Sequence, residues 1–209
     1  MRLVNRFLDW ISAVIRSYMA YVAKILNRLT GGRLSPHVVT IIGLLAHVPI
    51  AILIAVEKNE LAAVLLIVFG LFDSLDGTLA RLQKRDGSVG MLLDATTDRM
   101  KEVLLYTGIT YAIAAGDRPL LAAWAAAACG SSLLVPYVKA KGETAIAKSH
   151  LSPSEINRVF GDGLMRFGVR VFVLVVGLLS NRLILAVIII AVMASLTAFD
   201  RLIKISRKI

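Results

Sequence analysis

The feature that most restricts the fold of this 209-residue chain is a series of six long, largely apolar stretches. They cover approximately residues 37–56, 61–83, 89–115, 119–141, 163–180 and 182–204. Each is close to the roughly 20 residues that an α-helix needs to cross the hydrocarbon core of a membrane. The 57% share of hydrophobic residues and the mean hydropathy of +0.76 are also typical of integral membrane proteins. We therefore predict an all-α membrane protein with six transmembrane helices.

The segment before the first apolar stretch has a different pattern. Apolar and basic residues alternate at helical spacing over residues 3–29, as Phe7 and Arg6 illustrate. This pattern predicts an amphipathic helix that lies on the membrane surface. Gly31-Gly32 is expected to end this helix, and Ser35-Pro36 to begin the next one.

The sequence contains no sign of a second domain. We expect one domain over residues 1–209, made of a juxtamembrane amphipathic segment over 1–34 and a six-helix bundle over 37–205. The run of alanine and glycine over residues 122–130 would allow close helix packing, and we expect a homodimer.

The distribution of positive charge predicts how the helices are oriented. Of 24 lysines and arginines, only Lys58, Arg118 and Arg182 belong to the three very short connections between the apolar stretches. Because basic residues collect on the cytoplasmic side, we expect both termini and the active site to be cytoplasmic in a multi-pass protein of the cell membrane. This topology and the lipid headgroups account for the net charge of +10, so nucleic acid is not an expected partner.

Four aspartates interrupt the apolar pattern in the second and third stretches. They belong to the pattern Asp73-x2-Asp76-Gly77-x2-Ala80-Arg81-x8-Gly90-x3-Asp94-x3-Asp98. At about 100° of turn per residue, the residues before the x8 gap fall within roughly 140° of one helix. Those after it fall within about 80° of the next helix. Ionisable groups are costly in a bilayer, so two facing polar stripes indicate a functional site.

Carboxylates gathered in a small volume need cations between them. Oxygen ligands of this type suit magnesium, manganese or calcium, and four of them can hold two ions in an arrangement used for phosphoryl transfer. Arg81 would supply a fork of donors to a phosphate. The alternative is that the aspartates cap helices and turns, but capping does not explain Asp76 or Asp98, which lie inside expected helices.

The full pattern resembles the signature of the CDP-alcohol phosphotransferase family (class I), membrane enzymes that make phospholipids by displacing CMP from a CDP-alcohol. The resemblance implies two divalent metal ions, Mg²⁺ or Mn²⁺, held by Asp73, Asp76, Asp94 and Asp98, with Asp98 also the catalytic base. It implies that a CDP-linked lipid is bound by Pro36, Val39, Thr40, Asp73, Gly77, Ala80, Arg81, Ser88 and Gly90.

A second group of basic residues indicates the acceptor alcohol. The segments that carry these basic residues resemble the branch of the family that makes phosphatidylinositol phosphate, or its archaeal counterpart archaetidylinositol phosphate, from inositol phosphate. The resemblance implies that a phosphorylated polar alcohol is bound by Lys139, Lys141, Arg166, Arg170 and Arg201. Lys141 stands where that branch has arginine, and the arginines of the pair Arg166-x3-Arg170 lie one residue farther apart than expected.

Three functions remain open at this point. The first is transfer of a phosphatidyl-type group from a CDP-lipid to inositol phosphate, and the second is the same reaction with glycerol 3-phosphate or another alcohol. The third is a cation transporter that uses the aspartates as an ion path. A path would need polar residues across the whole membrane, whereas residues 44–56 and 104–115 are almost wholly apolar.

Overall fold

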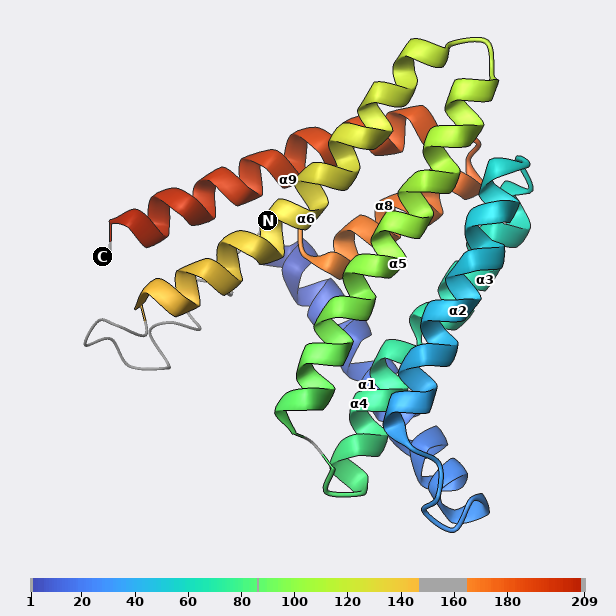
Figure 1. Cartoon of the computed structure of the whole chain (residues 1–209), viewed down its shortest axis with the longest axis vertical. Coiled ribbons are helices and arrows are strands. Elements are labelled where there is room, and N and C mark those ends of the chain that lie inside the picture. The colour runs from blue at the N-terminus through green and yellow to red at the C-terminus, as the bar shows by residue number, and fades with distance from the viewer. Residues whose placement is uncertain (1, 86, 147–164, 208–209) are drawn as a thin grey trace. The chain divides into compact units, whose positions relative to one another are not determined.

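The structure, a computed structural model, describes residues 2–85, 87–146 and 165–207, without the side chains of residues 2–12, 16, 73 and 146. All regular elements in this part are helical (Figure 1). They are α1 (Arg2–Leu29), α2 (Pro36–Ala55), α3 (Asn59–Gly70), α4 (Phe72–Leu82), α5 (Ser88–Ala115), the 3₁₀ turn η1 (Pro119–Leu121), α6 (Ala122–Ile146), α8 (Phe167–Leu179) and α9 (Leu183–Ser206). The all-α prediction is therefore confirmed for the described residues.

Four helical stretches in the described residues are long and apolar enough to cross a membrane. They are Pro36–Ala55, Asn59–Leu82, Pro119–Ala145 and Leu183–Ser206. Helix α8 is apolar but shorter, and the 28-residue α5 is not among the four. The acidic and basic side chains in the first half of α5 lower its hydropathy. A multi-pass membrane protein is supported, and the count of six spans stays a prediction.

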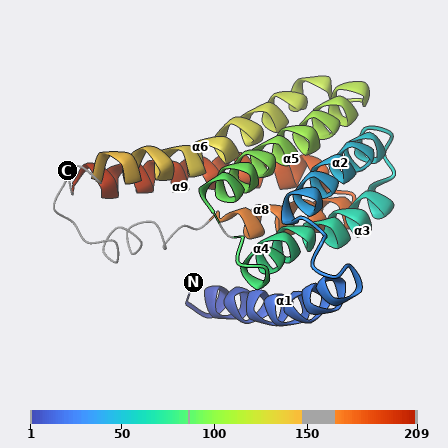
Figure 2. The ribbon, with the colours of Figure 1, turned by 60° about the horizontal axis from the view of Figure 1, so that its bottom comes forward.

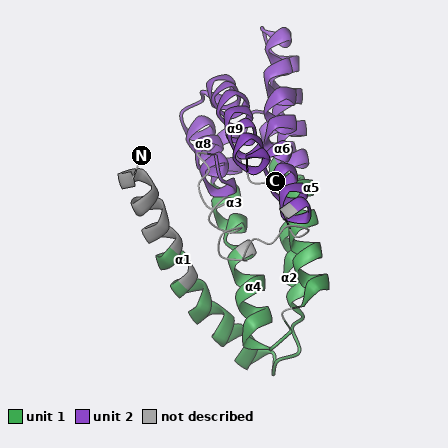
Figure 3. Ribbon diagram, turned by 90° about the vertical axis from the view of Figure 1, so that its left-hand side faces the viewer, with its two compact units in different colours: residues 1–50, 64–101 green, residues 51–63, 102–209 purple. Residues whose placement is uncertain are grey.

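The chain forms two compact units, which Figure 3 shows in different colours. The first consists of residues 1–50 and 64–101, and the second of residues 51–63 and 102–209. The expectation of one domain over residues 1–209 stays a prediction.

The core of the first unit joins three helices. Met19 and Ala23 from α1, Val39 from α2, and Leu75 and Leu79 from α4 are buried together. Figure 2 shows α1 running alongside α4. Met19 and Ala23 thus pack on protein, whereas other large side chains of α1, such as Tyr18 and Tyr21, are exposed. The predicted contact of α1 with the membrane surface stays a prediction.

The end of α1 follows the sequence signal. Gly31 and Gly32 have φ angles of 59° and 74°, a left-handed conformation that glycine adopts without strain. The side chain of Gln83, just after α4, donates to Asn27 Oδ1 and to the Leu34 carbonyl, both at 2.9 Å. These bonds fix the segment that leads into α2, where the first residues of the candidate site lie.

The second unit is built on α6 and α9, which run side by side (Figures 1 and 2). Small residues let its helices approach closely. A Cβ atom at Gly108 would overlap with the Ala51 carbonyl oxygen, and one at Gly177 would lie 2.5 Å from Ala186 Cβ. At one end of this unit, Asn59 Nδ2 donates to Asn181 Oδ1 at 3.0 Å, which ties the start of α3 to the turn before α9.

Candidate active site

A cavity of about 490 Å³ lies within the first unit. Its wall comes from the start of α2, from α4, from the short connection after α4, and from the start of α5. The lining residues are Pro36, His37, Thr40, Asp76, Gly77, Ala80, Arg81, Arg85, Gly87, Ser88, Gly90, Met91 and Asp94. Most of the residues expected to bind a CDP-lipid therefore gather at one place.

Asp76 is the most deeply placed acid of the cavity, with 4% of its surface exposed. Its Oδ2 accepts a hydrogen bond of 2.6 Å from the Thr40 hydroxyl, and its Oδ1 accepts one of 2.6 Å from the Gly77 backbone N–H. Thr40 itself is 5% exposed. Thr40, expected beside the nucleotide, therefore also orients one of the expected metal ligands.

The glycines of the signature lie beside other residues of the cavity wall. A Cβ atom at Gly77 would lie 3.7 Å from Nη1 of Arg81, and one at Gly90 would lie 3.5 Å from the ring of His37. The Arg81 side chain is exposed and donates from Nη2 to the Thr78 hydroxyl at 3.2 Å. A guanidinium at the edge of such a cavity can bind a phosphate with two parallel bonds.

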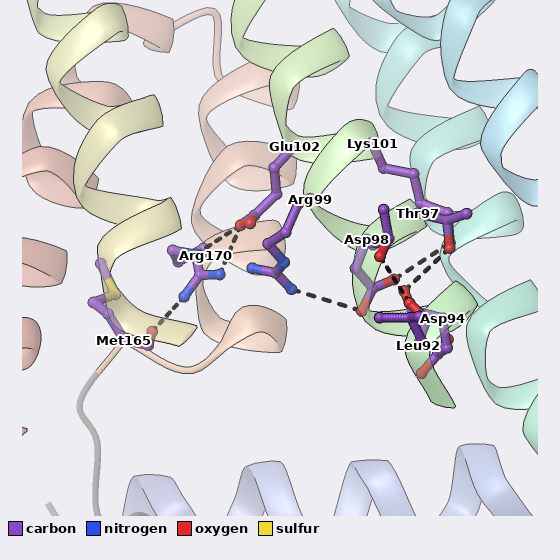
Figure 4. A network of polar contacts seen from close by, with 10 residues as sticks. Leu92, Asp94, Thr97, Asp98, Arg99, Lys101, Glu102, Met165 and Arg170 are labelled. Carbon is purple, nitrogen blue, oxygen red and sulfur yellow. Dashed lines mark hydrogen bonds and ion pairs between the residues drawn. The ribbon is translucent and has the colours of Figure 1, made fainter. Parts of the chain in front are cut away.

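Asp94 and Asp98 follow one another at one-turn spacing on α5. Asp94 lines the cavity and is exposed, whereas the Asp98 side chain is 19% exposed and does not line it. Asp98 Oδ1 lies 3.4 Å from Nζ of Lys101, and its Oδ2 lies 3.7 Å from Nη2 of Arg99 (Figure 4). Each oxygen of the expected catalytic base thus faces a cation of its own helix.

The expected metal ligands fit a hard divalent cation by their chemistry. Asp76 and Asp94 bring carboxylate oxygens to the same cavity, and oxygen ligands suit magnesium and manganese. The side chain of Asp73 lies outside the described residues. Among the side chains that are described, no three histidines, cysteines, aspartates or glutamates come close enough to hold a metal ion.

One predicted binding residue does not line the cavity, and four residues that were not predicted do. Val39 is 4% exposed in the core of the first unit and does not line the cavity. His37, Arg85, Gly87 and Met91 line the cavity although the sequence did not single them out for it. Their positions beside Pro36, Ser88 and Gly90 in the chain were the only available signal.

The basic residues expected to bind the acceptor all lie in the second unit. Lys139 is exposed and pairs with Glu143 at 3.7 Å, and Lys141 lies 6.0 Å from the ring centre of Tyr137. Arg166, just before α8, is exposed, and the charges of Arg166 and Arg170 both act on Arg201. The structure thus brings together three of the five expected residues.

Arg170 and Arg201 are buried, and both bind to protein groups. Arg170 is 2% exposed and donates from Nε and Nη2 to Oε1 of Glu102, at 2.9 and 2.7 Å. Its Nη1 donates to the Met165 carbonyl at 2.7 Å (Figure 4). Arg201, 6% exposed, donates from Nη1 to the Val135 carbonyl at 2.9 Å. The sequence did not indicate Glu102 as a partner.

Comparison with known proteins agrees with this arrangement. Residues 33–199 match the model of the CDP-alcohol phosphatidyltransferase family, and the chain belongs to that family. Among curated proteins, it is similar to the phosphatidylinositol phosphate synthase of Corynebacterium glutamicum, with 34% identity over 125 residues that cover 58% of this chain and 56% of that protein. The enzyme of the same name from Mycobacterium tuberculosis is 37% identical over 113 residues, which cover 53% of this chain and 52% of that protein. These alignments span about half the length of the curated relatives.

Solved structures extend the similarity along most of the chain. The crystal structure of the M. tuberculosis phosphatidylinositol phosphate synthase with CDP-DAG bound has a TM-score of 0.75 and 29% identity, over 90% of this chain and 92% of that one. The same protein in complex with manganese and citrate has a TM-score of 0.76 and 28% identity, over 90% of this chain and 88% of that one.

Proposed function

We propose that this chain is an enzyme of phospholipid synthesis that transfers a phosphatidyl-type group from a CDP-linked lipid to a hydroxyl of inositol phosphate and releases CMP. The donor is CDP-diacylglycerol or an ether-lipid analogue. The observation that carries the proposal is the 490 Å³ cavity, where Asp76 and Asp94 meet Gly77, Arg81 and Gly90. The similarity to phosphatidylinositol phosphate synthases, one of them solved with CDP-DAG bound, supports the same conclusion.

In this proposal the cavity binds the CDP part of the donor. Arg81 binds a phosphate, while Gly77, Ala80 and Gly90 leave room for the nucleotide to approach the helices. Pro36, Thr40 and Ser88 complete the wall. Asp73 and Val39 remain part of the proposed CDP site because of the family pattern. Since Val39 is buried, its role would be to pack next to Thr40.

Asp73, Asp76, Asp94 and Asp98 would hold two divalent ions, Mg²⁺ or Mn²⁺. When bound, such ions neutralise negative charge on the pyrophosphate and on the departing CMP. Asp98 accepts the proton of the attacking hydroxyl as the new phosphorus–oxygen bond forms. The Thr40 hydroxyl and the Gly77 N–H keep the Asp76 carboxylate in one orientation throughout.

The acceptor is proposed to be inositol phosphate because cations gather in the second unit. The charges of Arg166 and Arg170 both oppose that of Arg201, and a phosphate between them would relieve this repulsion. Exposed Arg166 is the member best placed to meet a ligand, whereas Arg170 is held by Glu102. Lys139 and Lys141 add positive charge on α6.

The protein is proposed to be a multi-pass protein of the cell membrane with six spans and with both termini and the active site in the cytoplasm. The small number of basic residues in the three short connections supports this orientation. A homodimer is part of the proposal, because Ala123, Ala127 and Gly130 are exposed at regular spacing along α6.

One assay tests the reaction and the acceptor together. The protein in detergent is given CDP-diacylglycerol, Mn²⁺ and in turn inositol phosphate, inositol, glycerol 3-phosphate or serine, and CMP is measured. We expect release to be fastest with inositol phosphate and to stop with EDTA.

The control for this assay is Asp117→Asn, which changes an exposed aspartate outside the signature and should retain full activity. Asp94→Asn should lose it. The absence of CMP with every acceptor would overturn the reaction, and faster release with glycerol 3-phosphate would overturn the acceptor alone.

A further inference from the structure

A buried lysine lies beside the expected catalytic base. Lys101 on α5 is 1% exposed, and its Nζ lies 3.4 Å from Oδ1 of Asp98. Its charge also acts on Asp76, the buried acid of the cavity. Lys101 is not part of the family signature described above.

The surroundings of Lys101 are largely apolar helix. Its side chain reaches α2 at Gly43, where a Cβ atom would lie 3.9 Å from Nζ. The next turn of α2 carries His47, which is 3% exposed and hydrogen-bonds through Nδ1 to the Gly43 carbonyl at 2.7 Å. An ammonium in such a place is costly, and an apolar side chain could fill the same space at less cost. A functional role explains why a cation is present.

The two oxygens of Asp98 are held differently. Oδ1 faces Lys101, whose side chain is 1% exposed. Oδ2 faces Arg99 at 3.7 Å, and the Arg99 side chain is 27% exposed. Solvent and substrate can therefore displace the contact at Oδ2 more easily than the contact at Oδ1.

We propose that Lys101 is a positioning residue for Asp98: it holds Oδ1, so that Oδ2 receives the proton of the attacking hydroxyl. This role rests on the function proposed above. Its permanent positive charge also competes with the metal ions that Asp98 helps to hold.

The test compares Lys101→Met, which removes the charge but keeps the length, with Lys101→Arg, which keeps the charge. For Lys101→Met we expect kcat for CMP release to fall about 10- to 100-fold, with the KM for CDP-diacylglycerol unchanged. Because a competing cation is gone, Mn²⁺ should bind several-fold more tightly in calorimetry. Lys101→Arg should recover part of kcat and bind Mn²⁺ like the wild type. Lys204→Met, at an exposed position on α9, is the matched control and should behave like the wild type.

The possible outcomes separate this role from the function on which it rests. An inactive wild type would overturn the proposed function and this role together. An active wild type with an equally active Lys101→Met would overturn only the role of Lys101. A parallel loss of kcat, Mn²⁺ binding and thermal stability would assign Lys101 to the fold instead. The same conclusion would follow if Lys101→Met failed to fold while Lys101→Arg had the wild-type kcat.

Discussion

The buried ion pair between Arg170 and Glu102 gives the sharpest prediction about stability. The Arg170 side chain is 2% exposed and that of Glu102 is 5% exposed, and two hydrogen bonds of 2.7 and 2.9 Å join them. Glu102→Met leaves a buried guanidinium without its carboxylate, and Arg170→Met leaves a buried carboxylate without its guanidinium. Breaking a buried pair from one side costs about 3–5 kcal/mol.

The double variant should be more stable than either single one. With both charges gone, one loss that remains is at the Met165 carbonyl, which no longer receives the 2.7 Å bond from Arg170. A buried acceptor left without its donor costs about 1–3 kcal/mol. The two substitutions should therefore be strongly non-additive in a double-mutant cycle.

Thermal unfolding in detergent can measure these differences. At about 2–4 °C per kcal/mol for a chain of this size, each single substitution should lower Tm by about 6–20 °C. The exposed pair of Lys204 and Asp200, at 2.6 Å, is the matched control, and its loss should cost about 0.5 kcal/mol or less. The reasoning is refuted if the single substitutions are as mild as the control, or if their costs simply add in the double variant.

Four further outcomes follow from the site and the expected orientation. Asp98→Asn should abolish CMP release while CDP-lipid binding, measured by calorimetry, stays near the wild-type value; a wild-type rate would show that Asp98 is not the base. Arg81→Ala should raise the KM for the CDP-lipid about 10- to 100-fold and leave the KM for the acceptor unchanged; the opposite pattern would move Arg81 to the acceptor site. Thr40→Val should destabilise the metal-free protein by about 1.5–3 kcal/mol, because the buried Asp76 carboxylate loses a 2.6 Å donor, and an unchanged unfolding curve would contradict this. Asn59→Cys on a Cys129→Ala background should react with an impermeant thiol reagent in intact cells, and protection from it would reverse the predicted orientation.

Most helix positions could be predicted because hydropathy and turn residues are local signals. The left-handed Gly31-Gly32 and the start of α2 at Pro36 are where the sequence indicates them. The stretch expected over 61–83 is two helices that meet at Leu71, directly after Gly70, which has no side chain to favour a helix. The predicted pair of helices on either side of residue 86 is confirmed.

The candidate site shows what local patterns leave out. Nine of the 13 residues that line the cavity were predicted, and six of these nine belong to the signature, because helical spacing places them on one side of each helix. Val39 was predicted from the same segment as the cavity residues at the start of α2. It lies on the side of α2 that faces the core of the first unit and not the cavity. The partner of Arg170 is 68 residues away in the chain, and such a pairing depends on how helices pack, which no spacing rule predicts.

The buried pair also bears on how the chain enters the membrane during synthesis. Helix α5 carries several charged side chains and is not among the helices that are long and apolar enough to cross a membrane, and Glu102 has its partner on α8. Lys101 and Arg99 accompany Asp98 within α5, but Arg170 is made 68 residues after Glu102. If α5 crosses the membrane as proposed above, the charge of Glu102 is balanced only after Arg170, 68 residues later, has been synthesised. We therefore expect the insertion of α5 and its packing against α8 to be coupled.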